Sequence, residues 1–221
     1  MARTRNHESV KKSVKKSVKK RVKKGVKKSV KKGVKKSSKR NNKLRTRKQR
    51  GGNDKSLVDL AMDGKIDEVK TLLAHPDTDV NMVDDNGFTA LQLASIHNHI
   101  GVVNVLLAQP NINVNQADTT DDKRTALLDA AEAGNTEAVF TLLGHPDINV
   151  NQVDNKGETA LYLAASYGHT DVVKALLGNL DIEVNKANSN GITALQTAIN
   201  RGHADVESEI QKAIRRPISP A

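Results

Sequence analysis

The sequence contains no cysteine and no tryptophan among its 221 residues. The absence of cysteine excludes disulfides, thiolate nucleophiles and thiolate-bound zinc, and it is compatible with a reducing compartment. Only four Phe and Tyr side chains occur, at Phe88, Phe140, Tyr162 and Tyr167. A hydrophobic core must therefore be built from Leu, Val, Ile and Ala, which is typical of stacked small units.

Long apolar runs are absent as well. No stretch approaches the eighteen apolar residues of a transmembrane helix, and no apolar segment follows the N-terminus as a secretory signal would require. These patterns predict a soluble chain with no integral membrane segment and no classical secretion signal.

Charge is distributed unevenly along the chain. Residues 1–50 contain 24 Lys and Arg against Glu8 alone, a net charge of +23, whereas residues 51–221 contain 12 basic and 24 acidic residues, a net charge of −12. The overall charge of +11 is the sum of two halves of opposite sign. The two halves are therefore interpreted separately.

The acidic half repeats with a period of about 34 residues. Thr-Ala-Leu begins at Thr89, Thr125, Thr159 and Thr193, spaced by 36, 34 and 34 residues. Leu-Leu and Val-Asn pairs keep the same register, and Leu57 marks an earlier unit. A fixed period of this length predicts a stack of five similar units.

Each unit is expected to form a helical hairpin. In the fourth unit, Thr159 is placed to cap a short helix that ends at Gly168. A second helix follows, with Val172, Val173 and Leu176 at the spacing of one apolar face. Where Pro76, Pro110 and Pro146 follow shortly after the Leu-Leu pair, proline must end the second helix because it supplies no amide donor. An extended Asn-Val-Asn link then leads to the next unit.

These residues resemble the ankyrin repeat, whose pattern runs Gly-x-Thr-Pro-Leu-His-Leu-Ala-Ala-x-x-Gly-His, then Val-Val-x-Leu-Leu, then Asp-Val-Asn. Ala replaces the Pro of Thr-Pro-Leu in four units, His is missing after that Leu, and Asn98 stands where Gly is expected. The resemblance implies an all-α fold, an ankyrin-repeat solenoid of helix-turn-helix units with β-hairpin-like loops, preceded by a disordered basic tail. The predicted domains are a disordered polybasic tail at 1–52, a repeat domain at 53–216 and a C-terminal tail at 217–221, with units at about 53–84, 85–118, 119–153, 154–187 and 188–216.

The two end units carry polar residues where the inner units are apolar, as the ends of a solenoid require. Val206-Glu207-Ser208-Glu209 stands at the register of Val172-Val173-Lys174-Ala175. The first unit carries Asp59 and Asp63 in its first helix. Both ends are therefore expected to be caps.

The third unit has two additional residues before Thr125. Its segment from Asp118 to Arg124 has Lys123 in place of the turn Gly and is expected to form a charged hairpin tip. The segment fits a calcium loop poorly, because Lys123 occupies the position of the Gly turn. Two interpretations remain, a tolerated loop insertion and a part of a binding surface.

The resemblance also implies that a partner protein is bound by the hairpin tips and by the first helices, which line the concave face. Phe88, Tyr167 and Ile192 are expected to be exposed there, either as interface anchors or as isolated apolar residues. The partner itself is not identified by the sequence, and the chain is expected to be a monomer. The predicted protein-binding residues are Phe88, Ile96, His97, Asp121, Asp122, Arg124, Glu132, Asn155, Glu158, Ser166, Tyr167, Ile192, Asn200 and Arg201.

Catalytic and cofactor-binding motifs are not found. No Ser lies in a Gly-x-Ser-x-Gly elbow, and Gly51-Gly52 is interpreted as a hinge and not as a phosphate-binding loop. Histidines recur in register, which predicts a role in turns, and the side chains of His97 and His99, two residues apart, are expected to diverge. The sequence therefore predicts a protein that is not an enzyme and has no cofactor and no metal site.

The basic tail has a finer repeat of four residues. Residues 9–36 comprise seven tetrads of Ser, Arg or Gly followed by Val-Lys-Lys. A step of four residues turns a helix by about 400°, so the valines do not form one stripe, and a membrane-lying helix is disfavoured. The composition predicts disorder in free solution. The residues expected to bind polyanions or to act in targeting are Lys11, Lys12, Lys15, Lys16, Lys19, Lys20, Arg21, Lys23, Lys24, Lys27, Lys28, Lys31, Lys32, Lys35 and Lys36.

The charge of this tail predicts binding to nucleic acid without sequence selectivity. Lys20-Arg21-Val22-Lys23 also resembles a nuclear-import signal. The whole chain is interpreted as a modular adaptor inside the cell, in the nucleus in preference to the cytoplasm. Two alternatives remain: a tail held at an anionic membrane surface, and a nucleic-acid condensing protein in which the repeats are regulatory. Opposite charges also allow the tail to fold back onto the acidic half.

Overall fold

The computed structural model describes residues 55–215. These residues form ten α-helices, and the only β-type pairing among them is an isolated bridge between Val83 and Thr89. The helices are α2 (Leu57–Met62), α3 (Ile66–Leu73), α4 (Ala90–Ile96), α5 (Ile100–Leu107), α6 (Ala126–Ala133), α7 (Thr136–Leu143), α8 (Ala160–Tyr167), α9 (Thr170–Leu177), α10 (Ala194–Arg201) and α11 (Ala204–Arg215).

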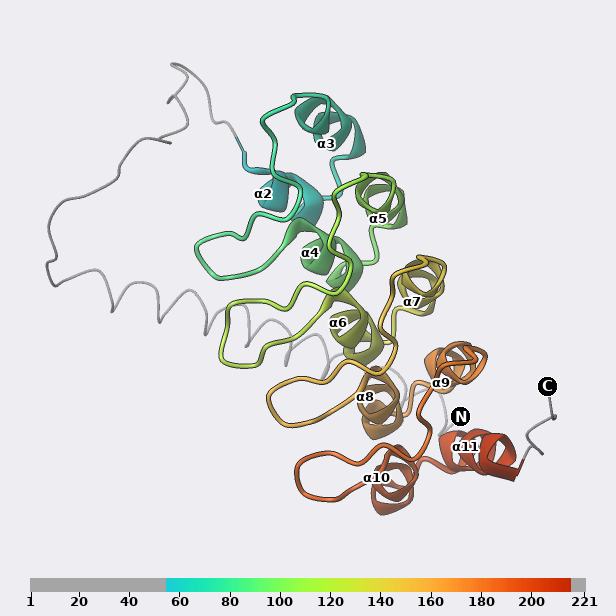
Figure 1. Cartoon of the computed structure of the whole chain (residues 1–221). Helices are drawn as coiled ribbons and strands as arrows, with labels where there is room; N and C mark the ends of the chain where they lie inside the picture. The colour runs from blue at the N-terminus through green and yellow to red at the C-terminus, as the bar shows by residue number, and fades with distance from the viewer. Residues whose placement is uncertain (1–54, 216–221) are drawn as a thin grey trace, which may run out of the picture.

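The helices form two rows (Figure 1). The inner row consists of α2, α4, α6, α8 and α10, and each of these helices contacts the next one in the row. The outer row consists of α3, α5, α7, α9 and α11, each packed against the inner helix that precedes it in sequence. This stack of helical hairpins confirms the predicted solenoid.

Local sequence explains where the inner helices begin and end. Thr159 has an extended backbone and accepts a hydrogen bond from the amide of Tyr162 through its hydroxyl, as predicted for a cap. Gly168 ends the same helix with φ of 72°, in the left-handed region that costs Gly little. Asn98 takes this place after α4 with φ of 57°, which confirms the expectation that Asn substitutes for Gly there.

The loops after the outer helices are joined by an asparagine ladder. The side chain of Asn115 donates to the carbonyl of Asp147 at 2.6 Å and accepts from the amide of Asn149 at 2.8 Å, both in the next unit. Asn81 and Asn151 make the same pair of bonds to their own following units. These three asparagines thus satisfy backbone donors and acceptors of the next loop that have no partner within a helix.

Histidine and glycine fit together between successive units. The ring of His169 lies against Gly134, where an added Cβ would come within 2.7 Å of it, and its Nε2 lies 3.0 Å from the carbonyl oxygen of Glu132. His203 packs in the same way on Gly168. Histidine therefore connects the second, fourth and fifth units to the unit before each, and Asn135 bonds to the carbonyls of Ser95 and Ile96 at the same register of the third.

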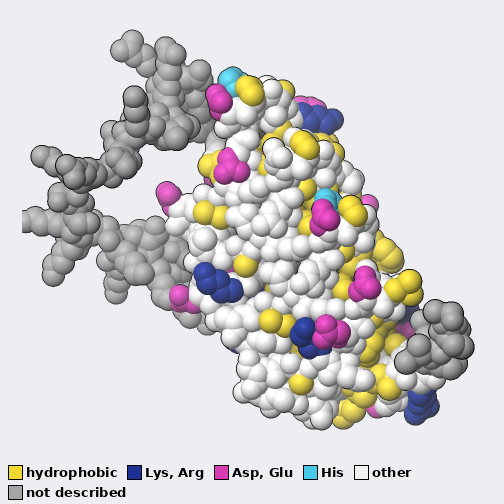
Figure 2. All heavy atoms as spheres, viewed as in Figure 1, with side chains coloured by type: hydrophobic (Ala, Val, Ile, Leu, Met, Phe, Trp, Pro, Cys, Tyr) yellow, Lys and Arg dark blue, Asp and Glu magenta, His cyan; other side chains and the backbone are white. Residues whose placement is uncertain are grey.

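The core consists mainly of Leu, Val and Ala side chains between the two rows. Some large apolar side chains lie at the surface instead: Phe140 on α7 is 59% exposed, and Leu180 after α9 is fully exposed. Figure 2 shows hydrophobic side chains gathered on the side where Figure 1 places α7 and α9. At the last unit, Ile199 and Ile214 are also exposed, so this end is less polar than expected of a cap.

Candidate functional site: the hairpin tips and the inner helices

Four hairpin tips project beside the inner helices, at residues 84–88, 118–124, 154–158 and 188–192 (Figure 1). Each tip is closed by a backbone hydrogen bond between its first and last residues, for example from the amide of Asp118 to the carbonyl of Arg124 at 2.7 Å. Adjacent tips are also joined, since the amide of Asn155 donates to the carbonyl of Asp122 at 3.0 Å. The tips therefore form one continuous edge of the stack.

The longer third tip keeps the same closure despite its two additional residues. Lys123 adopts φ of 54° at the position where the other tips have Gly87, Gly157 and Gly191. Such a conformation costs a residue with a Cβ about 1–2 kcal/mol. The predicted charged hairpin tip is thus present, with a strained Lys at its turn.

The residue directly before the capping Thr is buried in the second and third units. Phe88 is fully buried in the core, which corrects the prediction that it is an exposed anchor. The backbone on either side of its tip is paired by the Val83–Thr89 bridge, and the ring belongs to the hydrophobic core. Arg124 occupies the same register in the third unit and is only 5% exposed, so its predicted exposure is also wrong.

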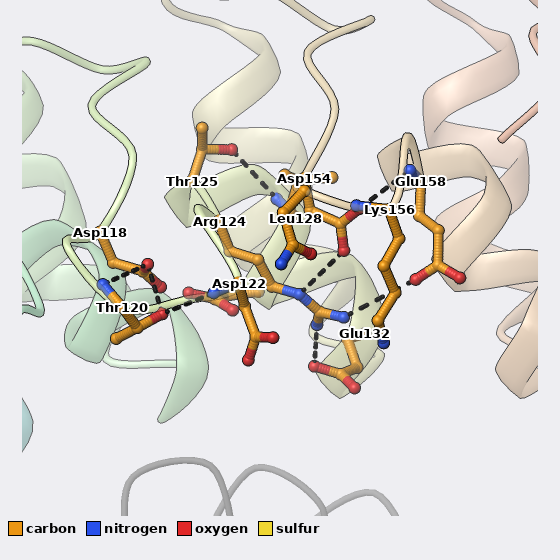
Figure 3. Close-up of polar contacts among 12 residues, drawn as sticks. Asp118, Thr120, Asp122, Arg124, Thr125, Leu128, Glu132, Asp154, Lys156 and Glu158 are labelled. Atoms are coloured by element: carbon orange, nitrogen blue, oxygen red, sulfur yellow. Dashed lines mark hydrogen bonds and ion pairs between the residues drawn. The ribbon is translucent and has the colours of Figure 1, made fainter. Parts of the chain in front are cut away.

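Arg124 is surrounded by carboxylates (Figure 3). Its Nη1 pairs with Glu132 on α6, its Nε lies 3.4 Å from Oδ2 of Asp154, and its Nη2 lies 3.9 Å from Oε2 of Glu158. Asp154 in turn accepts hydrogen bonds from the amides of Lys156 and Glu158, which orders the fourth unit's tip. One guanidinium therefore connects the tips of two units to an inner helix.

The pKa values of this cluster follow its charges. Burial lowers the pKa of Arg124, but the carboxylates of Glu132, Asp129, Asp154 and Asp122 outweigh burial and raise the pKa above its ordinary value. The pKa of half-buried Glu158 is raised by burial first and by repulsion from Asp154 second. Arg124 is therefore charged at every accessible pH, whereas Glu158 binds a proton more readily than an exposed Glu.

A second buried polar group lies between the second and third units. Gln92 on α4 is fully buried, and its Nε2 donates to the carbonyl of Arg124 at 2.8 Å and to Oδ2 of Asp129 at 3.2 Å. Asp129 is only 1% exposed. Gln92, Asp129 and Asp154 were not among the predicted site residues, although an Arg at a core register requires a buried partner.

A second set of equivalent positions, near the ends of the inner helices, is also partly buried. It consists of Ile96, Glu132, Ser166 and Asn200. Glu132 and Ser166 are each 4% exposed, so their predicted place on an open binding surface is wrong. The next inner helix covers them, because α6 packs on α8 and α8 on α10. Ile96 is half-buried, and only Asn200, in the last unit, is exposed.

One residue further along the inner helices, the side chains reach the surface. Half-buried Tyr167 donates its hydroxyl to Oε1 of Glu132 at 3.1 Å, and the guanidinium of exposed Arg201 lies 5.8 Å from its ring centroid. Exposed His97 stacks on His99 with ring centroids 5.9 Å apart. This stacking corrects the prediction that the two histidines diverge, since the turn through Asn98 brings them together.

The remaining predicted residues lie on the tips. Asp121 and Asn155 are exposed, and Asp122, Glu158 and Ile192 are half-buried. Figure 2 shows acidic side chains at the edge of the view where Figure 1 places the tips. The basic residues predicted to bind polyanions, Lys11 to Lys36, lie outside the described residues.

Among residues 55–215, no group of three or more His, Asp or Glu side chains is arranged to hold a metal ion. The same part of the chain contains no helix that is long and apolar enough to cross a membrane.

Comparison with protein families agrees with the geometry. A family model described as ankyrin repeats (3 copies) matches residues 22–118, 57–154 and 127–211, which together are well over half of the chain. The chain belongs to the ankyrin-repeat proteins. Ankyrin repeats are protein–protein interaction modules and are generally not catalytic. The paired helices, capping threonines and joined tips are the features that the repeats share here.

Proposed function

We propose that this protein is an adaptor whose ankyrin repeats bind a protein partner through the tips and the exposed ends of the inner helices, while residues 1–50 hold it at nucleic acid or direct it to the nucleus. The observation that carries the first part is the Tyr167–Arg201 pair. Tyr and Arg are the residues that most often dominate interface energies, and both side chains are held in place by contacts within the repeats.

The charged tips support the same proposal. Arg124 ties the third and fourth tips to α6, so the surface offered to a partner is ordered before binding. A preordered surface loses less conformational entropy on association. The proposed protein-binding residues are Ile96, His97, Asp121, Asp122, Asn155, Glu158, Tyr167, Ile192, Asn200 and Arg201.

Affinity capture tests the proposal on the intact chain. A nuclease-treated native lysate is passed over the wild-type chain, over Tyr167→Ala with Arg201→Ala, and over Phe140→Ala. The last variant is the matched control, because it removes an exposed aromatic ring from outer helix α7. We expect a discrete protein on the wild type and on the control, and at least a tenfold weaker signal on the double variant.

The role of the tail is tested separately. Binding of the intact chain to duplex DNA is measured between 50 and 200 mM salt, where contacts to several phosphates predict a steep fall in affinity. If the wild type and both variants capture the same amount of protein, the proposed binding surface on the repeats is wrong. If the affinity for DNA does not depend on salt, the proposed role of residues 1–50 is wrong. If capture is lost entirely after nuclease treatment, the result favours the condensing-protein alternative.

A further inference from the structure

The described tips carry an uneven charge. Residues 84–88, 118–124 and 154–158 contain seven Asp or Glu against three Lys or Arg, whereas the fourth tip at 188–192 is uncharged. Arg124 is buried in these tips, and so are Asp118 and Asp154. Two lysines, Lys123 and Lys156, are exposed there, against five carboxylates that are half-buried or exposed: Asp84, Asp85, Asp121, Asp122 and Glu158. The first three tips thus present a net negative edge, which we call the acidic edge.

The same chain carries a matching positive segment. Residues 9–36 hold a Lys-Lys pair in each of seven tetrads and no acidic residue. We propose that this segment docks on the acidic edge of its own repeats and thereby competes with the protein partner. The competition with a partner rests on the proposed function, whereas the docking itself depends only on the charges of the chain.

The length of the connection permits the contact. About 19 residues separate residue 36 from the start of the described repeats at residue 55, and a flexible chain of that length spans about 24 Å on average. Helices in contact lie about 8–10 Å apart, so α6 and α8 are about 16–30 Å from α2 along the inner row. A tether of matching length gives an effective concentration in the millimolar range.

Docking would couple the two binding activities of the chain. A nucleic acid that takes the lysines away from the acidic edge exposes the tips, and a partner bound at the tips leaves the lysines available to nucleic acid. Thermodynamic linkage makes this effect equal in both directions. The tail therefore acts as an inhibitor of the repeats that a polyanion removes.

Paramagnetic broadening on the intact chain tests the docking directly. Because the chain has no cysteine, Ser17→Cys introduces a single site for a nitroxide label within the basic segment. At low salt we expect amide signals to broaden at the first three tips and much less at 188–192 or in the outer helices. At about 1 M salt, where screening acts within about 3 Å, the broadening should disappear. Addition of a duplex DNA should also remove it.

Charge variants supply the matched comparison. Asp85→Asn with Asp121→Asn and Asp122→Asn removes three charges from the acidic edge, and Asp67→Asn with Glu137→Gln and Asp171→Asn removes three exposed charges from outer helices. Only the first set should abolish the broadening, and it should tighten DNA binding by about threefold or more relative to the second.

Three results would overturn the docking: no broadening at low salt, broadening spread evenly over the outer helices, or broadening that depends on protein concentration, which would indicate the tail of a second copy. Since this measurement involves no partner, it is independent of the capture experiment. Docking without capture would contradict the proposed function alone, and capture without docking would contradict this inference alone.

Discussion

Replacing Arg124 by Met tests whether the buried guanidinium holds the third and fourth units together. Met fills a similar volume but leaves Glu132 and Asp154 buried with their charges uncompensated by the guanidinium. Removing one partner of a buried ion pair typically costs about 3–5 kcal/mol. We therefore expect the free energy of unfolding of the intact chain to fall by about that amount at pH 7.

Urea denaturation followed by circular dichroism at 222 nm measures the effect, since urea leaves the ionic strength unchanged. Lys156→Met is the matched control, because it removes an exposed basic residue from the adjacent tip and should change stability by less than about 0.5 kcal/mol. A second variant, Arg124→Met with Glu132→Gln, removes a charge from each side of the pair. It should recover part of the loss, and together with the single variant Glu132→Gln it gives the coupling energy of the pair.

The expected loss depends on the burial of the cluster, so a small effect would refute the reasoning. If Arg124→Met lowers the free energy of unfolding by less than about 1 kcal/mol, the pair behaves as an exposed surface ion pair. If the double variant is less stable than the sum of the two single variants predicts, the attraction between these two groups is not what stabilises the site.

Three further predictions concern single positions. Because the pKa of Glu158 is raised in the folded chain, the folded state binds this proton more tightly than the unfolded state does. The resulting contribution to stability is fully present below about pH 4.3 and is lost as the pH rises through the folded pKa. Glu158→Gln should flatten that part of the pH profile of the free energy of unfolding, measured by urea denaturation. Gly134→Ala should lower the melting temperature, because φ is 73° and the added Cβ would lie within 2.7 Å of the His169 ring. Gly144→Ala, at φ of −73°, should leave the melting temperature unchanged or raise it, and equal effects of the two changes would contradict both reasons. Lys123→Gly should raise the free energy of unfolding by about 1 kcal/mol because it relieves a left-handed residue, and Lys156→Gly, which lacks positive φ, should not.

Local features of the chain could be predicted because each depends on a few neighbouring residues. Thr159 caps its helix because a hydroxyl at that position reaches the amide three residues later. Gly168 ends the helix because it enters the left-handed region without a Cβ penalty, and Asn98 does so for a related reason. Repetition of these signals at one period was sufficient to predict the stack of helical hairpins.

The candidate site was predicted only in part. Tyr167, Arg201 and Asp121 reach the surface as expected, and the third unit's tip is charged as expected. Phe88 and Arg124 were wrongly placed, although the sequence contained a signal: the same register holds the apolar residues Phe88 and Ile192, which suggests a position at least partly covered. Arg at such a position requires buried carboxylates nearby.

The sequence by itself determined the repeat, the helix boundaries, the turns and the division of charge between tail and body, because all of these follow from short-range geometry and from counting. Only the tertiary structure decided which side chains of a unit are covered, since Glu132 and Ser166 are buried by a helix of the following unit, about 34 residues away. The same stacking placed Arg124 among carboxylates from two units, Glu132 of its own and Asp154 and Glu158 of the next. Burial and charge pairing depend on neighbours in space, and the packing of one unit on the next sets those neighbours.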